Sequence, residues 1–558
     1  LKLKLTFFLC TVAAVGFGAV ELQPVKVSAQ AVTARPTPTP QSSRTPMPDA
    51  AVDDRSRPLP SQAKVPQTLD SLRSFIAARL ARPEVARGRV GVKIASLNTG
   101  KVIYEQDADK YFMPASNMKN FTVATAMEKL GPDFRFVTGV FAGAMPDPSG
   151  TIKGDVRILG GGDISISTAF FGTSPSDPET YYKGIDRLVD AIAAAGVKKI
   201  DGNIVGDESH FKGFAIPQTW EWDDLQWYYG AEVSALPIND NAVDLSVVPG
   251  AVGSPCVVNI APAPAMSLYQ VVNTCTTTAA NFRRTLGVNK KIDRNILEIS
   301  GTMPVGDKGF NDPITITHPA DLFVAILKQR LTKRGIVVSG STRTLTPAIP
   351  SSSPVEIAKL ESVPFSEVAA KTLKPSQNLY TETILWTLGE WLREKDAREI
   401  RDAMPRYTST DSADVGLTAV KSFLSEIGLP QDAVVQHDGC GMSRHDLITP
   451  SAVVTLYTYM AKQSKYAQAW RDALSIGGVD GTLASRFKGT AAAGNIRGKT
   501  GTIDQVSALS GYMTTMGGEP VVLSILVNDV PDGRMRVSLI DDITVAVANF
   551  DGKINQGQ

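Results

Sequence analysis

The sequence predicts an α/β (α+β) protein in which one helix-and-strand domain is interrupted by a mainly β insertion. Helical and strand patterns occur together near residue 70 and return after about residue 355. Between them, from about residue 133 to 354, short strands and glycine-rich turns dominate. The chain has 558 residues, 43% of them hydrophobic, which is enough for several domains with a substantial core.

Each expected element rests on a local signal. Helices are indicated by the spacing of apolar residues, and the first hairpin by an Asn98-Thr99-Gly100 turn between two apolar runs. Ser116 and Gly131 are start and stop signals of one helix. Helices are expected over 70–81, 116–131, 321–335, 365–392 and 533–550, and strands over 89–97, 101–107, 506–515 and 519–529.

The N-terminal region predicts export. Lys2 and Lys4 precede the apolar run 5–20, which is shorter than the roughly 20 residues of a membrane helix, and small residues follow it. We expect a signal peptide over 1–31 and a periplasmic or other extracytoplasmic location; a retained, membrane-associated anchor is the alternative. Residues 32–66 are rich in Pro, Ser and Thr, which predicts a disordered linker and leaves peripheral membrane or wall association open.

Charge and motif spacing argue against several functions. A net charge of +1 gives no indication of a nucleic-acid partner. No G-x-S-x-G motif supports an α/β-hydrolase, and the His, Asp and Cys residues of 437–446 fit no usual zinc spacing, so we interpret that segment as a loop. We expect no metal and no organic cofactor.

The run RGKTGT at 497–502 resembles the end of a phosphate-binding loop. Such a loop needs a glycine five positions before Gly498, where this chain has Ala493. An exported protein also meets little ATP. The alternative is the Lys-Thr-Gly strand of an enzyme that acylates its own serine.

A serine enzyme without a catalytic histidine can use lysine as its base. Ser116 and Lys119 stand three apart at an expected helix start, so their side chains share one face. Ser61 and Lys64 repeat the spacing, but in the expected linker, and we set them aside.

The order of three short motifs is more specific than any one of them. Ser116-x-x-Lys119 is followed by Ser376-Gln377-Asn378 and then by Lys499-Thr500-Gly501. This order is the signature of penicillin-binding proteins and serine β-lactamases.

Over about residues 70–550 the chain resembles the class C low-molecular-mass penicillin-binding proteins, the D-alanyl-D-alanine carboxypeptidase/endopeptidases. GGGD at 160–163, YGAEVSALPINDN at 229–241 and DGCGMSRHDLITP at 438–450 are similar to family segments. The long interval between Lys119 and Ser376 also resembles this class, which inserts two domains there. The resemblance implies a penicillin-binding/serine β-lactamase-like transpeptidase fold, with helices packed on an antiparallel sheet plus inserted mainly β domains.

The resemblance also implies a domain division. It comprises a split penicillin-binding catalytic domain (67–132 and 355–558), an inserted domain II (133–245 and 302–354) and a nested domain III (246–301).

For the chemistry, the resemblance implies that Ser116 is the acylated nucleophile and Lys119 its general base. Ser376 and Asn378 would assist proton transfer and hold the substrate. Lys499 would complete the catalytic set.

For binding, the resemblance implies that Lys499 and Thr500 recognise a terminal carboxylate. Gly501 would let the substrate backbone approach, and the backbone N–H groups of Ser116 and Thr502 would form the oxyanion hole. Arg444 is a candidate contact to the substrate side chain, with a structural surface arginine as the alternative.

Two positions depart from the family pattern, since Cys440 stands where serine is frequent and Gln377 where aspartate is frequent. We expect Cys440 to be an inert buried thiol or an oxidation-sensitive one, and Gln377 to matter less than its neighbours. Cys256 and Cys275, 19 residues apart, are able to form a disulfide in an exported protein.

The expected activity is that of a serine-type D-Ala-D-Ala carboxypeptidase with D,D-endopeptidase activity. Its substrate would be a peptidoglycan stem peptide or cross-link, and β-lactams would inhibit it covalently. A β-lactamase and a non-catalytic penicillin-binding cell-wall sensor are the alternatives. The sequence leaves the oligomeric state open.

Overall fold

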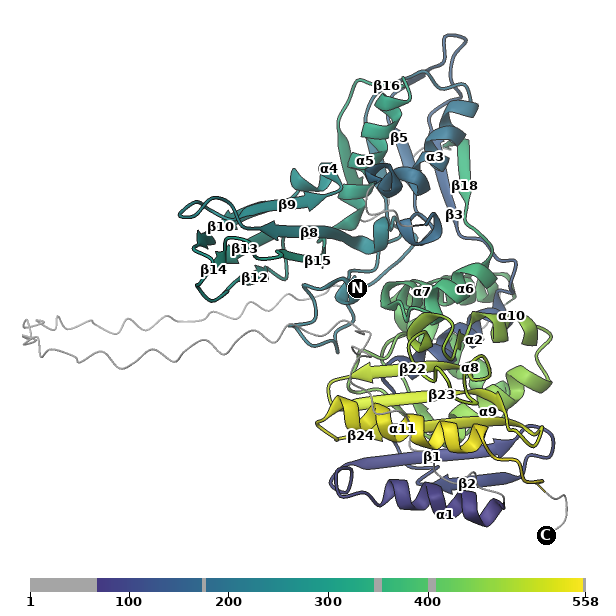
Figure 1. Ribbon diagram of the computed structural model, residues 1–558. Coiled ribbons are helices and arrows are strands. Elements are labelled where there is room, and N and C mark those ends of the chain that lie inside the picture. Colours follow the sequence, from purple (N-terminus) through teal and green to yellow (C-terminus); the bar gives the residue numbers. More distant parts are fainter. Residues whose placement is uncertain (1–67, 173–176, 346–353, 400–407, 555–558) are drawn as a thin grey trace, which may run out of the picture. The chain divides into compact units, whose positions relative to one another are not determined.

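The computed structural model describes residues 68–172, 177–345, 354–399 and 408–554 (Figure 1). The expected signal peptide and linker lie outside these ranges, so both stay predictions. Among the helices of the described ranges, none is both long and apolar enough to cross a membrane.

A six-stranded antiparallel sheet joins the first and last parts of the chain. Its order is β2-β1-β24-β23-β22-β21, so the N-terminal hairpin pairs with the last strand, β24. The strands are β1 (Arg89–Ser96), β2 (Val102–Gln106), β21 (Ser475–Ile476), β22 (Arg497–Ile503), β23 (Val506–Thr514) and β24 (Pro520–Asn528). This pairing confirms the expected fold class.

Both faces of this sheet are buried, and helices cover each of them. In β24, Val522 and Leu526 join one core while Leu523 and Ile525 join the other, because successive strand residues point to opposite faces. The core of Leu523 includes α1 (Leu69–Leu80) and α11 (Gly533–Ala548). The core of Val522 includes α2 (Lys119–Lys129), α6 (Phe365–Leu373), α7 (Asn378–Glu399), α8 (Ser412–Glu426), α9 (Pro450–Lys462) and α10 (Ala467–Ala473).

The inserted segment is mainly β and has its own hydrophobic core. A five-stranded sheet has the order β17-β7-β5-β3-β18, and α3 (Lys183–Ala194) and α5 (Pro319–Lys333) belong to the same core. The strands of this sheet are β3 (Val137–Ala142), β5 (Val156–Leu159), β7 (Ile204–Asp207), β17 (Thr342–Leu345) and β18 (Val355–Glu361).

Smaller sheets make up the rest of the insertion. Their orders are β15-β8-β9, β10-β13-β12, β11-β14 and β16-β6-β4. The strands are β4 (Thr151–Lys153), β6 (Lys199–Asp201), β8 (Ala242–Val248), β9 (Val257–Ala261), β10 (Gln270–Asn273), β11 (Thr276–Thr278), β12 (Gly287–Lys290), β13 (Ile296–Ser300), β14 (Thr302–Pro304), β15 (Phe310–Thr315) and β16 (Val337–Val338). The division of the insertion into domains II and III stays a prediction.

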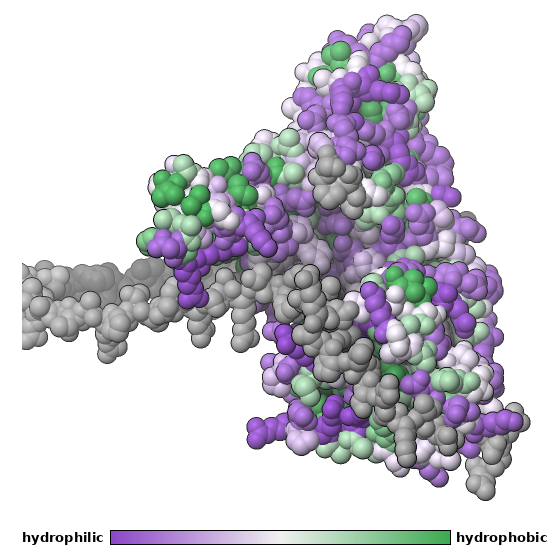
Figure 2. Space-filling view, in the orientation of Figure 1, coloured by the Kyte–Doolittle hydropathy of each residue, from purple (hydrophilic) through white to green (hydrophobic). Residues whose placement is uncertain are grey.

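Cys256 and Cys275 are joined by a disulfide in this part of the chain, with 5.4 Å between their Cα atoms. Figure 2 shows a largely hydrophilic surface, with apolar residues gathered on the part of the insertion that carries β9 and β10. Val257 and Val272 are among the exposed side chains there. Exposed apolar residues are common on soluble proteins, so this patch alone indicates no partner.

Candidate active site

Ser116 lies in the 3-10 turn η2 (Ala115–Met118), which leads directly into α2. The predicted helix therefore begins with a tighter turn than expected, after Ala115 in a left-handed conformation with φ of 46°. Lys119 Nζ donates to Ser116 Oγ over 2.9 Å. Ser116 is partly exposed and Lys119 is fully buried. The Ser116 hydroxyl is therefore accessible from solvent, whereas the Lys119 amine is not.

Lys119 is held in place by two further acceptors from distant parts of the chain. Its Nζ donates to Asn378 Oδ1 over 2.6 Å and to the carbonyl oxygen of Cys440 over 2.8 Å. Burial of an amine in apolar surroundings is costly unless it is hydrogen-bonded, and these oxygens provide such bonds. They also aim the amine at Ser116.

The second and third motifs meet through Lys499. This buried lysine donates from Nζ to Ser376 Oγ over 2.7 Å and to the carbonyl oxygen of Thr500 over 2.8 Å. Ser376 has a left-handed backbone, with φ of 69°, just before α7. Such conformations are found at functional sites when the surroundings hold them in place.

Strand β22 lies directly against the turn that carries Ser116. A Cβ atom at Gly501 would come within 2.6 Å of the carbonyl oxygen of Pro114 and 3.2 Å of the Asn117 backbone nitrogen. Asn117 Nδ2 also donates to the carbonyl oxygen of Lys499 over 3.1 Å. Glycine is thus required for the strand to approach the turn this closely. The three motifs, distant in sequence, come together here.

Three candidate binding residues lie around this strand. Thr502 is exposed on β22, and Thr500 Oγ1 donates to Thr482 Oγ1 over 2.7 Å. Arg444 pairs with Glu221 over 2.9 Å and donates to the carbonyl oxygen of Asp504 over 3.2 Å. Their roles toward substrate stay predictions.

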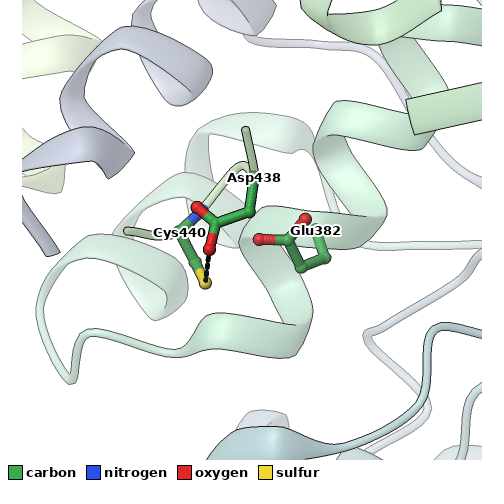
Figure 3. Close-up of side chains that lie close together, drawn as sticks. All are labelled: Glu382, Asp438 and Cys440. Atoms are coloured by element: carbon green, nitrogen blue, oxygen red, sulfur yellow. Dashed lines mark hydrogen bonds between the residues drawn. The ribbon is translucent and has the colours of Figure 1, made fainter. Parts of the chain in front are cut away.

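The segment 437–446, expected to be a loop, carries the Cys440 carbonyl oxygen that accepts from Lys119, and buried carboxyl groups hold its backbone in place. Asp438 Oδ1 accepts from the backbone nitrogens of Cys440 over 3.0 Å and Gly441 over 2.6 Å. Both carboxylate oxygens of Glu382 accept from the backbone nitrogen of Gly439, at 2.9 and 3.1 Å. Figure 3 shows Glu382, Asp438 and Cys440 close together, with Cys440 Sγ 3.8 Å from Asp438 Oδ2.

The chemistry of this buried group favours a structural role. Complete burial, and then the charge of Asp438, raise the pKa of Glu382 to about 8. Burial likewise raises the pKa of the Cys440 thiol well above its ordinary value, so the thiol is not activated. The three side chains could place ligand atoms within 4.8 Å of one another. Because backbone N–H groups already engage both carboxylates, we assign the group to the loop rather than to a metal.

Several contributors to the site were not among the predicted residues. The carbonyl oxygen of Cys440 accepts from Lys119, and that of Tyr229 accepts from Asn378 Nδ2 over 3.0 Å. Both are main-chain groups, which every residue carries, so no residue type marks them. Glu382 stands four residues after Asn378, and that helical spacing was the one available signal.

Comparisons with known proteins find relatives over most of the chain. The chain is 29% identical to a D-alanyl-D-alanine carboxypeptidase of Actinomadura sp. (strain R39) over 87% of this chain and 86% of that protein. It is 25% identical to the D-alanyl-D-alanine carboxypeptidase DacB of Haemophilus influenzae over 80% of this chain and 87% of that protein.

The fold is also similar to a solved structure, penicillin binding protein 4 (dacB) of Haemophilus influenzae. The TM-score is 0.69 at 22% identity, covering 85% of this chain and 98% of that one. Residues 72–547 match the D-Ala-D-Ala carboxypeptidase 3 (S13) family, and the chain therefore belongs to that family.

Proposed function

We propose that this chain is a serine-type D-Ala-D-Ala carboxypeptidase that works through an acyl-enzyme on Ser116. The observation that carries the proposal is the 2.9 Å bond from the buried Lys119 Nζ to the partly exposed Ser116 Oγ. The family assignment and the carboxypeptidase relatives support the reaction class.

In the acylation step, Lys119 acts as a neutral amine, so its Nζ lone pair faces Ser116 Oγ in place of the hydrogen it donates there in the protonated form. Nζ takes the proton of Ser116 Oγ, and this oxygen attacks the carbonyl carbon between the two D-Ala residues. The carbonyl oxygen becomes an oxyanion. The backbone N–H groups of Ser116 and Thr502 are the proposed donors to it.

Collapse of this intermediate breaks the C–N bond and expels the terminal D-Ala. The leaving nitrogen takes up the proton that Lys119 received from Ser116, and the Ser376 hydroxyl is the proposed relay. Because this hydroxyl accepts from Lys499 Nζ over 2.7 Å, Lys499 orients it and keeps its own charge. Lys119 holds the proton taken from Ser116 and also contacts Asn378 over 2.6 Å, so the second motif borders both lysines. Water then attacks the ester carbonyl carbon and gives a proton to Lys119, and the bond from that carbon to Ser116 Oγ breaks as Lys119 returns the proton to Oγ.

The substrate carboxylate is assigned to the third motif. Lys499 is fully buried, so we infer that it acts on the carboxylate mainly through its charge. The hydroxyls of Thr500 and Thr502 are the proposed direct donors. The Thr500 hydroxyl, which donates to Thr482 over 2.7 Å, would turn toward the carboxylate when substrate binds.

The finer activities follow from the same acyl-enzyme. A cross-linked stem peptide presents a similar D,D-bond, which supports D,D-endopeptidase activity as well. A β-lactam would acylate Ser116 and stay attached; a similar fold, Haemophilus influenzae penicillin binding protein 4, is known in complex with a β-lactam. A peptidoglycan substrate implies an extracytoplasmic location, with any membrane or wall association peripheral.

The test is to incubate the wild type and Ser116→Ala with labelled penicillin and, separately, with a peptide ending in D-Ala-D-Ala. We expect covalent label and D-Ala release from the wild type only. Label without D-Ala release would favour the penicillin-binding sensor, and rapid turnover of penicillin would favour a β-lactamase. A wild type that neither binds label nor releases D-Ala would refute the proposed enzymatic function.

A further inference from the structure

The second motif, Ser376-Gln377-Asn378, contacts the inserted segment as well as Lys499 on strand β22. Asn378 Nδ2 donates to the carbonyl oxygen of Tyr229 over 3.0 Å. Gln377 Nε2 donates to Asp240 Oδ2 over 3.3 Å. Tyr229 and Asp240 both belong to the insertion, far from the motif in sequence. The insertion therefore reaches the residues that flank Ser376.

Asp240 lies at the centre of an unusual piece of backbone. Asn239, Asp240 and Asn241 are consecutive left-handed residues, with φ of 46°, 61° and 51°. Such a conformation costs free energy at each non-glycine residue and persists only when neighbouring contacts stabilise it. Asn239 Nδ2 donates to the carbonyl oxygen of Tyr181 over 3.0 Å, and Asn241 Nδ2 to that of Glu232 over 2.8 Å. These contacts fix Asp240 in position.

The Asp240 carboxyl is shared between the insertion and helix α7. Its Oδ1 accepts from Ser167 Oγ over 2.6 Å, within the insertion, and from Tyr380 OH over 2.5 Å, on α7. Burial raises its pKa, which these hydrogen bonds oppose. One carboxyl thus joins Ser167, Tyr380 and Gln377.

This contact gives a physical reason for the glutamine at position 377. Its Oε1 accepts from the backbone nitrogen of Leu379 over 3.2 Å, while its Nε2 faces Asp240. An aspartate or glutamate here would place a second carboxyl against Asp240, with no amide hydrogen between them. Like charges in a buried site repel strongly.

We propose that Asp240 is a positioning residue, through which the inserted segment holds Ser376 and Asn378 in their reactive arrangement by way of Gln377 and Tyr380. The inference deepens the proposed function and rests on it, because the arrangement matters only if these residues take part in acylation. It assigns the insertion a role in the catalytic step.

The test is a double-mutant cycle on the contact, using Asp240→Asn, Gln377→Glu and the double variant. Asp240→Asn replaces Oδ2 by an amide nitrogen, so two N–H donors then face each other. Gln377→Glu instead brings two carboxyl groups face to face. The double variant restores a donor–acceptor pair with the direction reversed. We expect each single change to lower the second-order rate of penicillin acylation about tenfold, and the double variant to recover most of it.

Asp201→Asn is the matched control. Asp201 is an exposed carboxylate of the same insertion whose partners are Ser339 Oγ and Lys199 Nζ, both at 3.0 Å, and neither partner contacts the second motif or Asp240. It should acylate at the wild-type rate. The thermal unfolding temperature of every variant is measured as well. If the double variant recovers acylation without recovering thermal stability, the recovery reflects positioning rather than folding.

The outcomes separate the two proposals. A wild type that takes no label refutes the proposed function. A labelled wild type with unchanged single variants, or a double variant whose loss is the product of the two single losses, overturns the role of Asp240 alone.

Discussion

Lys119 and Lys499 are both fully buried, but they contact different residues of the site. Lys119 contacts Ser116, the proposed nucleophile, at 2.9 Å. Lys499 instead contacts Ser376, at 2.7 Å, and lies on the strand expected to receive the substrate. A base has to reach the hydroxyl that it deprotonates, and this contact supports the proposal that Lys119 is the base.

Replacing Lys119 by alanine should therefore abolish measurable acylation. We expect the rate of labelling by penicillin to fall by about 10²–10⁴, the usual contribution of a general base. Lys129→Ala, in the same helix, is the control, since Lys129 pairs with Glu426 away from the motifs. Normal labelling of a folded Lys119→Ala variant would remove Lys119 as the base.

Gly501→Ala tests how closely β22 must approach Ser116. The added methyl group would meet the Pro114 carbonyl oxygen at 2.6 Å, which is main chain and cannot rotate away. We expect the strand to shift and acylation to fall about tenfold or more, as misplacement by about 1 Å can cost 10²-fold. Gly143→Ala is the control, because a Cβ there has nothing within 4 Å. Equal rates for the two variants would show that the approach is not needed.

Residue types and their order predict side chains that the structure brings together, whereas they do not predict the main-chain groups beside them. Ser116, Lys119 and Lys499 were identifiable because their residue types and order are specific. The carbonyl oxygen of Cys440 was not, since its position depends on how Asp438 folds the loop. Gln377 is expected to matter less than its neighbours, which stays a prediction, and its contact to Asp240 could not be read from the sequence.

At the scale of elements, helix α7 holds Lys119 by two routes. Asn378 accepts from Lys119 directly, and Glu382, one turn later, holds the backbone of Gly439 beside the Cys440 carbonyl that also accepts from Lys119. The helix therefore sets the relative position of both acceptors.

Glu382 should make stability depend on pH in a predictable direction. Its pKa is raised to about 8 in the folded protein, so folding retains a proton that the unfolded chain releases at lower pH. Its contribution to stability is present at low pH and is lost as pH rises toward about 8.

Glu382→Gln removes this titration while keeping an acceptor for Gly439. We expect the free energy of unfolding of the wild type, relative to the variant, to fall by on the order of 4 kcal/mol between about pH 5 and about pH 9. Chemical unfolding of both proteins at several pH values measures it. A difference that stays constant with pH would show that Glu382 does not titrate in this range.

For the whole molecule, the broad architecture could be predicted and the strand pairing could not. The α/β ends and the β insertion followed from local patterns, such as the hairpin now seen as β1 and β2. Nothing local predicts that β1 pairs with β24, or that β18 pairs with β3 across the insertion. Such pairs depend on contacts between distant segments, which a single sequence does not display.

Removing the disulfide tests whether the stability of the insertion affects the rate of acylation at the site. Cys256 and Cys275 join β-rich parts of the insertion, with Pro255 and Thr276 bridging beside them. The bond closes a short loop, so its removal should destabilise that region by about 2–4 kcal/mol. None of the described contacts of Ser116, Lys119 or Lys499 involves this region.

The variant Cys256→Ser/Cys275→Ser should therefore unfold at lower temperature and still be acylated by penicillin at the wild-type rate below its transition. Thermal unfolding and labelling kinetics on the same preparation measure both quantities. Reduced labelling of the folded variant would mean that this distant region is coupled to the site. Asp240 would be the first residue to test, because the strand that follows it, β8, pairs with β9, which begins next to Cys256.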